Sequence, residues 1–89
     1  MQKREVRIVN RLGLHARAAA RIVSVVSSYR CTVALGFGNR HANARNILAV
    51  MLLAASMGAT ITIETNGPDE SEAMSAVTRL VNDRFGEAE

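Results

Sequence analysis

Two hydrophobic periodicities alternate along this chain of 89 residues, and their order restricts the fold more than any other feature. Segments in which every second residue is apolar are typical of half-buried strands. Segments with apolar residues at i, i+3, i+4 and i+7 are typical of helices. The resulting order, β-α-β-β-α-β-α, predicts an α+β fold in which helices cover one face of a sheet. We expect strands over 5–10, 31–37, 40–44 and 59–64, and helices over 16–27, over 47–55, and after Asp69 to about Phe85.

The first predicted helix has one apolar and one polar face. The apolar stripe is expected to pack on the sheet, and the polar stripe begins beside His15. The apolar positions are Ala19, Ile22, Val23 and Val26, and the polar face carries Arg17, Ala20, Arg21, Ser24 and Ser28.

The second predicted helix is apolar on all sides, with Asn46 as its N-cap and Gly58 closing it. Only one of its two stripes can face the core of so small a fold. The other stripe is either an exposed patch for a partner or is buried by the rest of the chain, and the sequence leaves both readings open. One stripe consists of Ile47, Leu48, Met51, Leu52 and Ala55, and the other of Val50, Leu53, Ala54 and Met57.

The C-terminal part is predicted to contain a turn, a helix and a loose end. The turn is expected over 65–68, and Asp69 with Glu72 three residues later suggests a capping box at the start of the helix. Residues 86–89 are expected to fray. The buried stripe of this helix is predicted to be Ala73, Val77, Leu80 and Val81.

Composition and charge restrict the class of protein further. The lone Cys31 argues against a disulfide framework and is predicted to be a small buried residue in a reducing, cytoplasmic setting. The charged start offers no signal peptide, and the run over 46–63 is too interrupted by polar residues to span a membrane. One domain over 1–89 is expected.

The charges divide between the two halves of the chain. Residues 1–45 hold nine Lys and Arg against one Glu, whereas 46–89 hold two Arg against seven Asp and Glu. This predicts a basic face for anionic ligands or acidic partners. The alternative is an ordinary solvated surface whose positive and negative charges happen to fall in different halves of the sequence.

The stretch over 10–20 gathers the groups that bind and transfer a phosphoryl group. Gly13 permits a tight turn, and His15 lies where the first free N–H groups of a helix point outward. Arg17 adds a permanent cation with two N–H donors for phosphoryl oxygens. The second histidine, His41, lies in a short polar strand and is expected to be a surface residue.

Asn10-Arg-Leu-Gly-Leu-His-Ala-Arg17 resembles the active-site signature of the histidine-containing phosphocarrier protein HPr, of the bacterial phosphoenolpyruvate-dependent phosphotransferase system. The resemblance extends over the whole chain and implies an open-faced sandwich, βαββαβα, with a four-stranded antiparallel sheet and three helices. The segments 52–58 and 67–74 are similar to proteobacterial members, including the nitrogen-branch relatives.

The resemblance implies a stoichiometric carrier, not an enzyme. Nδ1 of His15 would accept a phosphoryl group from phosphorylated enzyme I and pass it to a histidine of an enzyme IIA protein or domain, in sugar uptake or a regulatory branch. The amides of Ala16 and Arg17 and the Arg17 guanidinium would hold the charge. No cofactor, metal or membrane insertion is implied, and a monomer is expected. The implied docking face consists of Ala20, Arg21, Ser24, Ile47, Leu48, Met51 and Leu52.

Two positions depart from the family pattern. Ala18 replaces the usual Pro, but Ala is an excellent helix former, so function should survive. Asn46 stands where many relatives carry a regulatory Ser, and Asn has no hydroxyl to phosphorylate. Control by a serine-directed kinase at this position is therefore excluded.

Two other classes of protein compete with this interpretation. A nucleic-acid module would suit a pI of about 10, but the chain lacks a Gly-x-x-Gly loop and an aromatic pair for base stacking. A regulatory binding protein that never carries phosphate would not need both His15 and Arg17, whereas a regulator that is itself phosphorylated stays open as an alternative.

Overall fold

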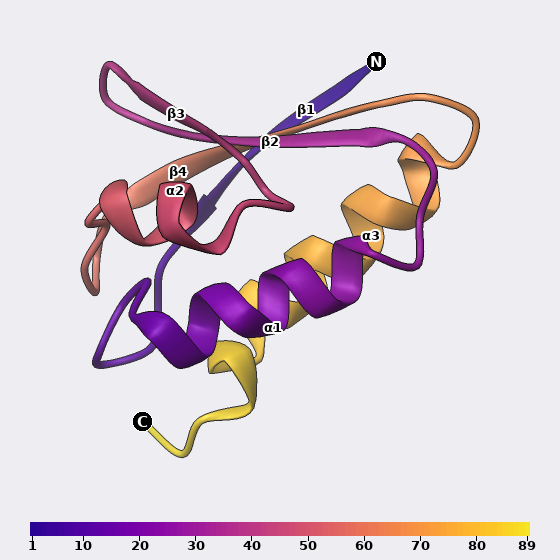
Figure 1. The fold of residues 1–89 in the computed structure, drawn as a ribbon. Helices are drawn as coiled ribbons and strands as arrows, with labels where there is room; N and C mark the ends of the chain where they lie inside the picture. Colours follow the sequence, from indigo (N-terminus) through magenta and orange to yellow (C-terminus); the bar gives the residue numbers. More distant parts are fainter.

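A computed structural model describes all of residues 1–89. It contains the predicted elements in the predicted order (Figure 1). A short 3-10 helix, η1, follows the last α-helix. The elements are β1 Gln2–Arg7, α1 Ala16–Val26, β2 Thr32–Phe37, β3 Arg40–Asn43, α2 Ile47–Leu52, β4 Thr60–Asn66, α3 Glu70–Asn82 and η1 Arg84–Gly86.

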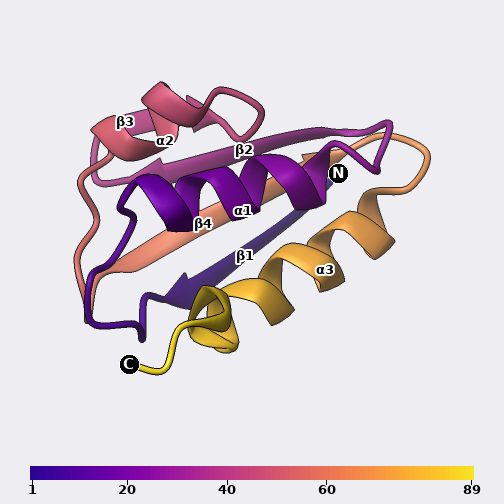
Figure 2. The ribbon, with the colours of Figure 1, turned by 60° about the horizontal axis from the view of Figure 1, so that its bottom comes forward.

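The four strands form one antiparallel sheet in the order β1-β4-β2-β3. Helices α1 and α3 lie side by side on one face, and α2 lies near β3 (Figure 2). The open-faced α+β sandwich expected from the sequence is therefore confirmed. None of the helices is long and apolar enough to cross a membrane.

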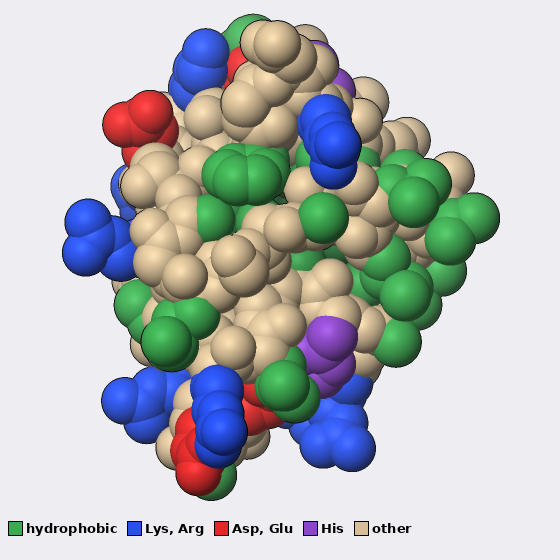
Figure 3. Space-filling model, turned by 90° about the vertical axis from the view of Figure 1, so that its left-hand side faces the viewer, with side chains coloured by type: hydrophobic (Ala, Val, Ile, Leu, Met, Phe, Trp, Pro, Cys, Tyr) green, Lys and Arg blue, Asp and Glu red, His purple; other side chains and the backbone are tan.

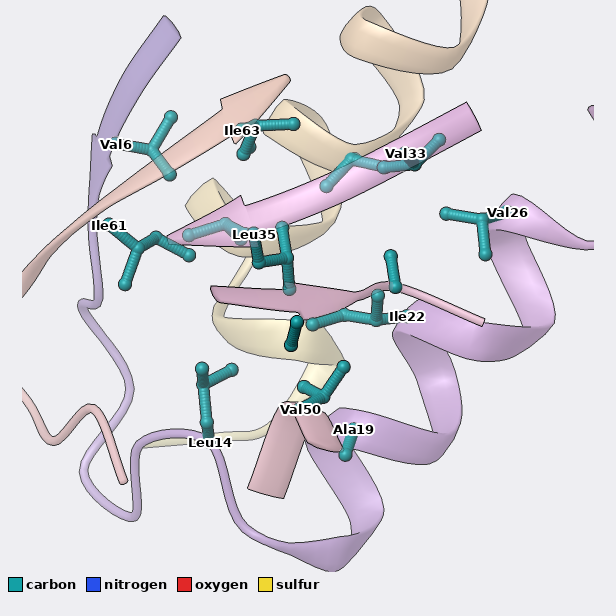
Figure 4. Close-up of a cluster of buried hydrophobic side chains, with 14 of the residues drawn as sticks. Val6, Leu14, Ala19, Ile22, Val26, Val33, Leu35, Val50, Ile61 and Ile63 are labelled. Atoms are coloured by element: carbon teal, nitrogen blue, oxygen red, sulfur yellow. The ribbon is translucent and has the colours of Figure 1, made fainter. Parts of the chain in front are cut away.

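The core fills the space between the sheet and the helices. Strand side chains of every second position point toward α1 and α3 (Figure 4). The central pair of strands contributes Leu35, which faces Ile63 across the ladder, and both are almost completely buried. From α1, Ala19, Ile22 and Val26 complete this layer. The alternating apolar residues of the strands and the apolar stripes of the helices therefore pack into a single hydrophobic cluster.

The strand boundaries differ from the prediction because long-range pairing extends the ladders. β1 begins at Gln2 and ends at Arg7, since charged residues at its start still pair with β4. β4 continues through Thr65 and Asn66, which were predicted to form a turn. Thr65 is fully buried and its hydroxyl donates to the Glu70 carbonyl at 3.0 Å.

Helix α2 is shorter than predicted, and Gly58 does not close it. The helix ends at Leu52, and Ala54 has a left-handed φ of 57°. This bend turns Ala55 inward, where its carbonyl accepts from the Leu14 N–H at 2.9 Å. Ala55 is therefore buried, and it does not belong to the exposed stripe that begins at Ile47.

The capping box predicted for Asp69 and Glu72 is wrong. The Asp69 side chain makes no bond to the start of α3. Its oxygens instead accept from the backbone N–H groups of Arg30 (2.8 Å) and Cys31 (2.9 Å) in the loop between α1 and β2. Those amides would otherwise lack a partner, so the tertiary contact prevails over the local cap.

These contacts predict an acid-dependent loss of stability. The Arg30 hydrogen bond, joined by Cys31 and opposed by burial, lowers the pKa of Asp69. Because the pKa of Asp69 is lower in the folded state, its ionised carboxylate stabilises the fold fully at pH values above the unfolded-state pKa of about 3.9. This stabilisation is lost as the pH falls through the folded-state pKa. Asp69→Asn should therefore be less stable than wild type at pH 7, with the gap narrowing toward pH 2. Urea unfolding at both pH values checks this, and a pH-independent gap would contradict it.

Candidate functional site

The loop before α1 is held in one shape by its contacts with the segment after α2. Gly13 has a φ of 66°, and a Cβ at this position would lie 2.5 Å from the Ala55 carbonyl oxygen. Only glycine satisfies both the conformation and the close approach. The fully buried Asn10 donates from Nδ2 to the Gly13 carbonyl at 2.9 Å. These bonds fix the position of the residue at the end of the loop, His15.

His15 is the N-cap of α1, as the sequence predicts. Its backbone is extended, and its carbonyl accepts from the Ala19 N–H at 2.9 Å. Its ring nitrogen Nδ1 accepts from the backbone N–H of Arg17 at 3.3 Å. The His15 side chain is 26% exposed. Nδ1 thus faces the positive end of the helix dipole, beside the first-turn amides of Ala16 and Arg17.

The C-terminal tail returns to this loop, so the prediction that residues 86–89 fray is wrong. Glu87 places one carboxylate oxygen against Nε2 of His15 and the other 3.0 Å from Nδ2 of Asn10. Glu89 pairs with Arg11 at 2.7 Å and accepts from the Arg11 backbone N–H at 3.0 Å. The tail is held because the loop offers it both donors and cations. No local pattern within 86–89 signals this docking.

An open hollow of about 690 Å³ lies beside His15. The guanidinium of Arg17 makes no hydrogen bond or ion pair to the rest of the chain, whereas Arg21 donates to the Phe85 carbonyl. Arg17 is therefore available to an incoming anion, and Arg21 holds the tail. The lining residues are Arg11, Leu12, His15, Ala16, Arg17, Arg21 and residues 86–89.

The surroundings of Glu87 keep its carboxylate ionised. Burial by itself would raise the pKa of Glu87. Hydrogen bonds from Asn10 and His15, with the charge of Arg17 and that of His15 when its ring is protonated, outweigh burial and lower it. The Glu87 side chain is only 10% exposed. A desolvated negative charge therefore lies against one face of the His15 ring.

The orientation of α2 settles the question that the sequence left open. Val50 and Leu53 are buried, whereas Ile47, Leu48 and Leu52 are 42%, 61% and 65% exposed. Asn46 caps the helix as predicted, accepting from the Ala49 N–H at 3.1 Å. The first stripe, apart from Ala55, is thus an apolar surface, with Met51 half-buried at its base.

This surface extends beyond the predicted residues. Leu12 in the His15 loop, which was not singled out from the sequence, is 67% exposed. Met57 was predicted to lie on the stripe with Val50 and Leu53, but α2 ends at Leu52, so Met57 lies outside the helix and is 60% exposed. Figure 3 shows hydrophobic side chains gathered on this side of the molecule, with a histidine at their border and Lys and Arg side chains nearby. Ala20 and Ser24 of the predicted docking face are exposed on α1, and Arg21 is half-buried. We call Leu12, Ile47, Leu48, Leu52 and Met57 the apolar surface.

The other titratable groups lie apart from this site. His41 is exposed on β3, as predicted. Cys31 is buried, and burial with the neighbouring Asp69 raises the pKa of its thiol, in keeping with a structural role. The fold brings together no group of three or more His, Cys, Asp or Glu side chains that could hold a metal ion.

Comparison with known proteins places this arrangement in a class of phosphoryl carriers. The family model described as "PTS HPr component phosphorylation site" matches residues 2–83. The chain belongs to the HPr family of phosphocarrier proteins of the phosphotransferase system.

Proteobacterial relatives match over nearly the full length. The phosphocarrier protein HPr of Cupriavidus necator is 45% identical over 89 residues, covering all of both chains. HPr of Pseudomonas aeruginosa is 44% identical over 86 residues, covering 96% of each. The phosphocarrier protein NPr of Shewanella violacea is 37% identical, covering 97% of this chain and 94% of the relative.

Solved HPr structures share the fold. The crystal structure of HPr from Thermoanaerobacter tengcongensis superposes with a TM-score of 0.94 at 34% identity, covering both chains completely. HPr from Bacillus anthracis gives a TM-score of 0.86 at 31% identity, covering 90% of this chain and 95% of that one.

Proposed function

We propose that this chain accepts a phosphoryl group on Nδ1 of His15 from phosphorylated enzyme I and passes it to a histidine of an enzyme IIA protein or domain. It acts as a stoichiometric carrier in sugar uptake or a regulatory branch and turns over no substrate of its own. The position of Nδ1 at the N-terminus of α1, beside the unpaired guanidinium of Arg17, carries this proposal.

The geometry supports transfer through Nδ1 without a metal or nucleotide. The Arg17 N–H that now donates weakly to Nδ1 can donate to a phosphoryl oxygen once the P–N bond forms. The Arg17 guanidinium and the Ala16 amide supply further donors at the same end of the helix. Positioning and charge stabilisation are the main demands of phosphoryl transfer, and this site provides both.

The apolar surface is the proposed docking site for both partners. It borders His15, so a protein bound there would bring its own histidine to the hollow. The cationic residues Arg11, Arg17 and Arg21 at its rim would steer acidic partners. Ala20 and Ser24 extend the contact along α1. A carrier that binds two partners one after the other needs this surface unoccupied before each encounter, which suits a monomer.

The proposal is tested by intact-mass spectrometry at alkaline pH. Incubation with enzyme I and phosphoenolpyruvate should add one phosphoryl group, which acid treatment removes because phosphohistidine is acid-labile. A reaction without phosphoenolpyruvate serves as the control. The proposal fails if an enzyme I that phosphorylates a known HPr leaves this chain unmodified.

The docking role predicts a kinetic effect without a stability effect. Leu48→Ala removes an exposed side chain, so the free energy of unfolding should change by less than about 0.5 kcal/mol. Loss of a central apolar contact should raise the KM of enzyme I for the carrier about tenfold. Steady-state phosphorylation with increasing carrier concentration measures this. An unchanged KM would place the docking surface elsewhere.

A further inference from the structure

The two ring nitrogens of His15 face groups of opposite hydrogen-bonding character. At Nδ1 the neighbour is a donor, the Arg17 backbone N–H. At Nε2 the neighbour is an acceptor, the Glu87 carboxylate. Both contacts agree on one neutral tautomer, with the proton on Nε2 and the lone pair on Nδ1.

Glu87 is held firmly enough to select that tautomer. Its second oxygen accepts from Nδ2 of the buried Asn10, which also ties the loop at Gly13. The tail that carries Glu87 is anchored by the fully buried Phe85, whose carbonyl accepts from Arg21. Both carboxylate oxygens of Glu87 are therefore engaged in hydrogen bonds, one with Asn10 in the loop and one with the His15 ring.

We propose that Glu87 is a positioning residue for phosphoryl transfer, holding the Nε2–H of His15 so that the Nδ1 lone pair is presented to phosphorus. This rests on the proposed function of His15. In the transfer the Nδ1–P bond forms from that lone pair, and the donor's P–N bond breaks with its electron pair returning to the donor's ring nitrogen. No proton moves at His15. Nε2 keeps its proton, and the adjacent carboxylate balances the positive charge that the ring gains.

Two substitutions separate this role from simple packing. Glu87→Ala removes the acceptor and leaves the ring free to sample both tautomers. Glu87→Gln keeps the shape but offers one oxygen to two donors, Asn10 and His15. Asn10 is fully buried and its Nδ2 is fixed by the Gly13 carbonyl, so the Gln oxygen should stay with Asn10, the donor that costs more to leave unpaired. The amide NH₂ then faces Nε2 and favours the wrong tautomer, as an amide does behind a catalytic histidine. Gln should therefore perform no better than Ala, whereas a packing role would make Gln nearly harmless.

The first readout is the ring ¹⁵N chemical shifts of His15 in the unphosphorylated protein, at a pH where the ring is neutral. Wild type should show a protonated Nε2 and an unprotonated Nδ1. In Glu87→Ala and Glu87→Gln the two shifts should move toward each other or exchange places. Glu89→Ala, in the same tail but without contact to His15, should match wild type. Wild-type shifts in both Glu87 variants would overturn the proposal.

The second readout is the rate of phosphorylation by enzyme I, expected to fall about tenfold or more in both Glu87 variants. A Glu87→Gln protein with the wild-type rate would overturn the positioning role. If wild type itself accepts no phosphoryl group, the function of His15 fails, and the ¹⁵N shifts still decide whether Glu87 sets the tautomer. The two failures are therefore distinct.

Discussion

Replacing His15 with alanine is expected to leave the chain without any phosphoryl group after incubation with enzyme I and phosphoenolpyruvate. The variant retains the Arg17 guanidinium and the helix N-terminus, but it has no lone pair to form the bond to phosphorus. Neither electrostatic stabilisation nor docking replaces a missing nucleophile. Intact-mass spectrometry should therefore show only the unmodified mass at times when wild type is fully phosphorylated.

The fold should survive this change at a small cost. His15 caps α1 through Nδ1 and pairs with Glu87, so its removal should lower the free energy of unfolding by about 1 kcal/mol. His41→Ala is the matched control, because His41 is exposed on β3, the edge strand of the sheet, and does not line the hollow beside His15. A phosphoryl group on His15→Ala, or its absence from His41→Ala, would contradict the assignment.

Leu35→Ala should produce the largest loss of stability. Leu35 is 1% exposed and lies in β2 opposite Ile63 of β4, in the middle of the sheet and under α1. Truncation leaves a cavity that this single aliphatic layer cannot refill, at a cost of about 2–5 kcal/mol. In a chain of this size the melting temperature should fall by roughly 10–25 °C.

Leu48→Ala makes this test specific, because it is the same substitution at a side chain that is 61% exposed. It should unfold at nearly the wild-type temperature while weakening the interaction with enzyme I. Leu35→Ala, measured well below its melting temperature, should show the opposite behaviour. Equal melting temperatures for the two variants would contradict the burial of Leu35.

The sequence pattern was sufficient to predict the features that depend only on neighbouring residues. The turn at Gly13 and the helix after His15 follow from the preferences of a few adjacent residues, and the structure places His15 as the N-cap. Asn46 caps α2 for the same reason. The functional roles of His15 and Arg17 stay predictions, but their positions at one helix end are confirmed.

Local patterns were insufficient where two distant segments compete for the same group. Asp69 has the spacing of a helix cap, yet its carboxylate accepts a hydrogen bond from the backbone N–H of Arg30, which is 39 residues earlier. Ala54 lies within an apolar helical run, yet the contact between Ala55 and Leu14 ends the helix early. In both cases a backbone N–H without a local partner decides the outcome.

The sequence by itself determined the order of the elements, the face of α1 that is buried and the residues at its N-terminus, because periodicity and capping act within a few positions. Only the tertiary structure decided which stripe of α2 faces outward and where the C-terminal tail lies. Glu87 reaches His15 across 72 positions in the chain. Such a contact depends on where β1, α1 and α3 end in space, and no local preference encodes that.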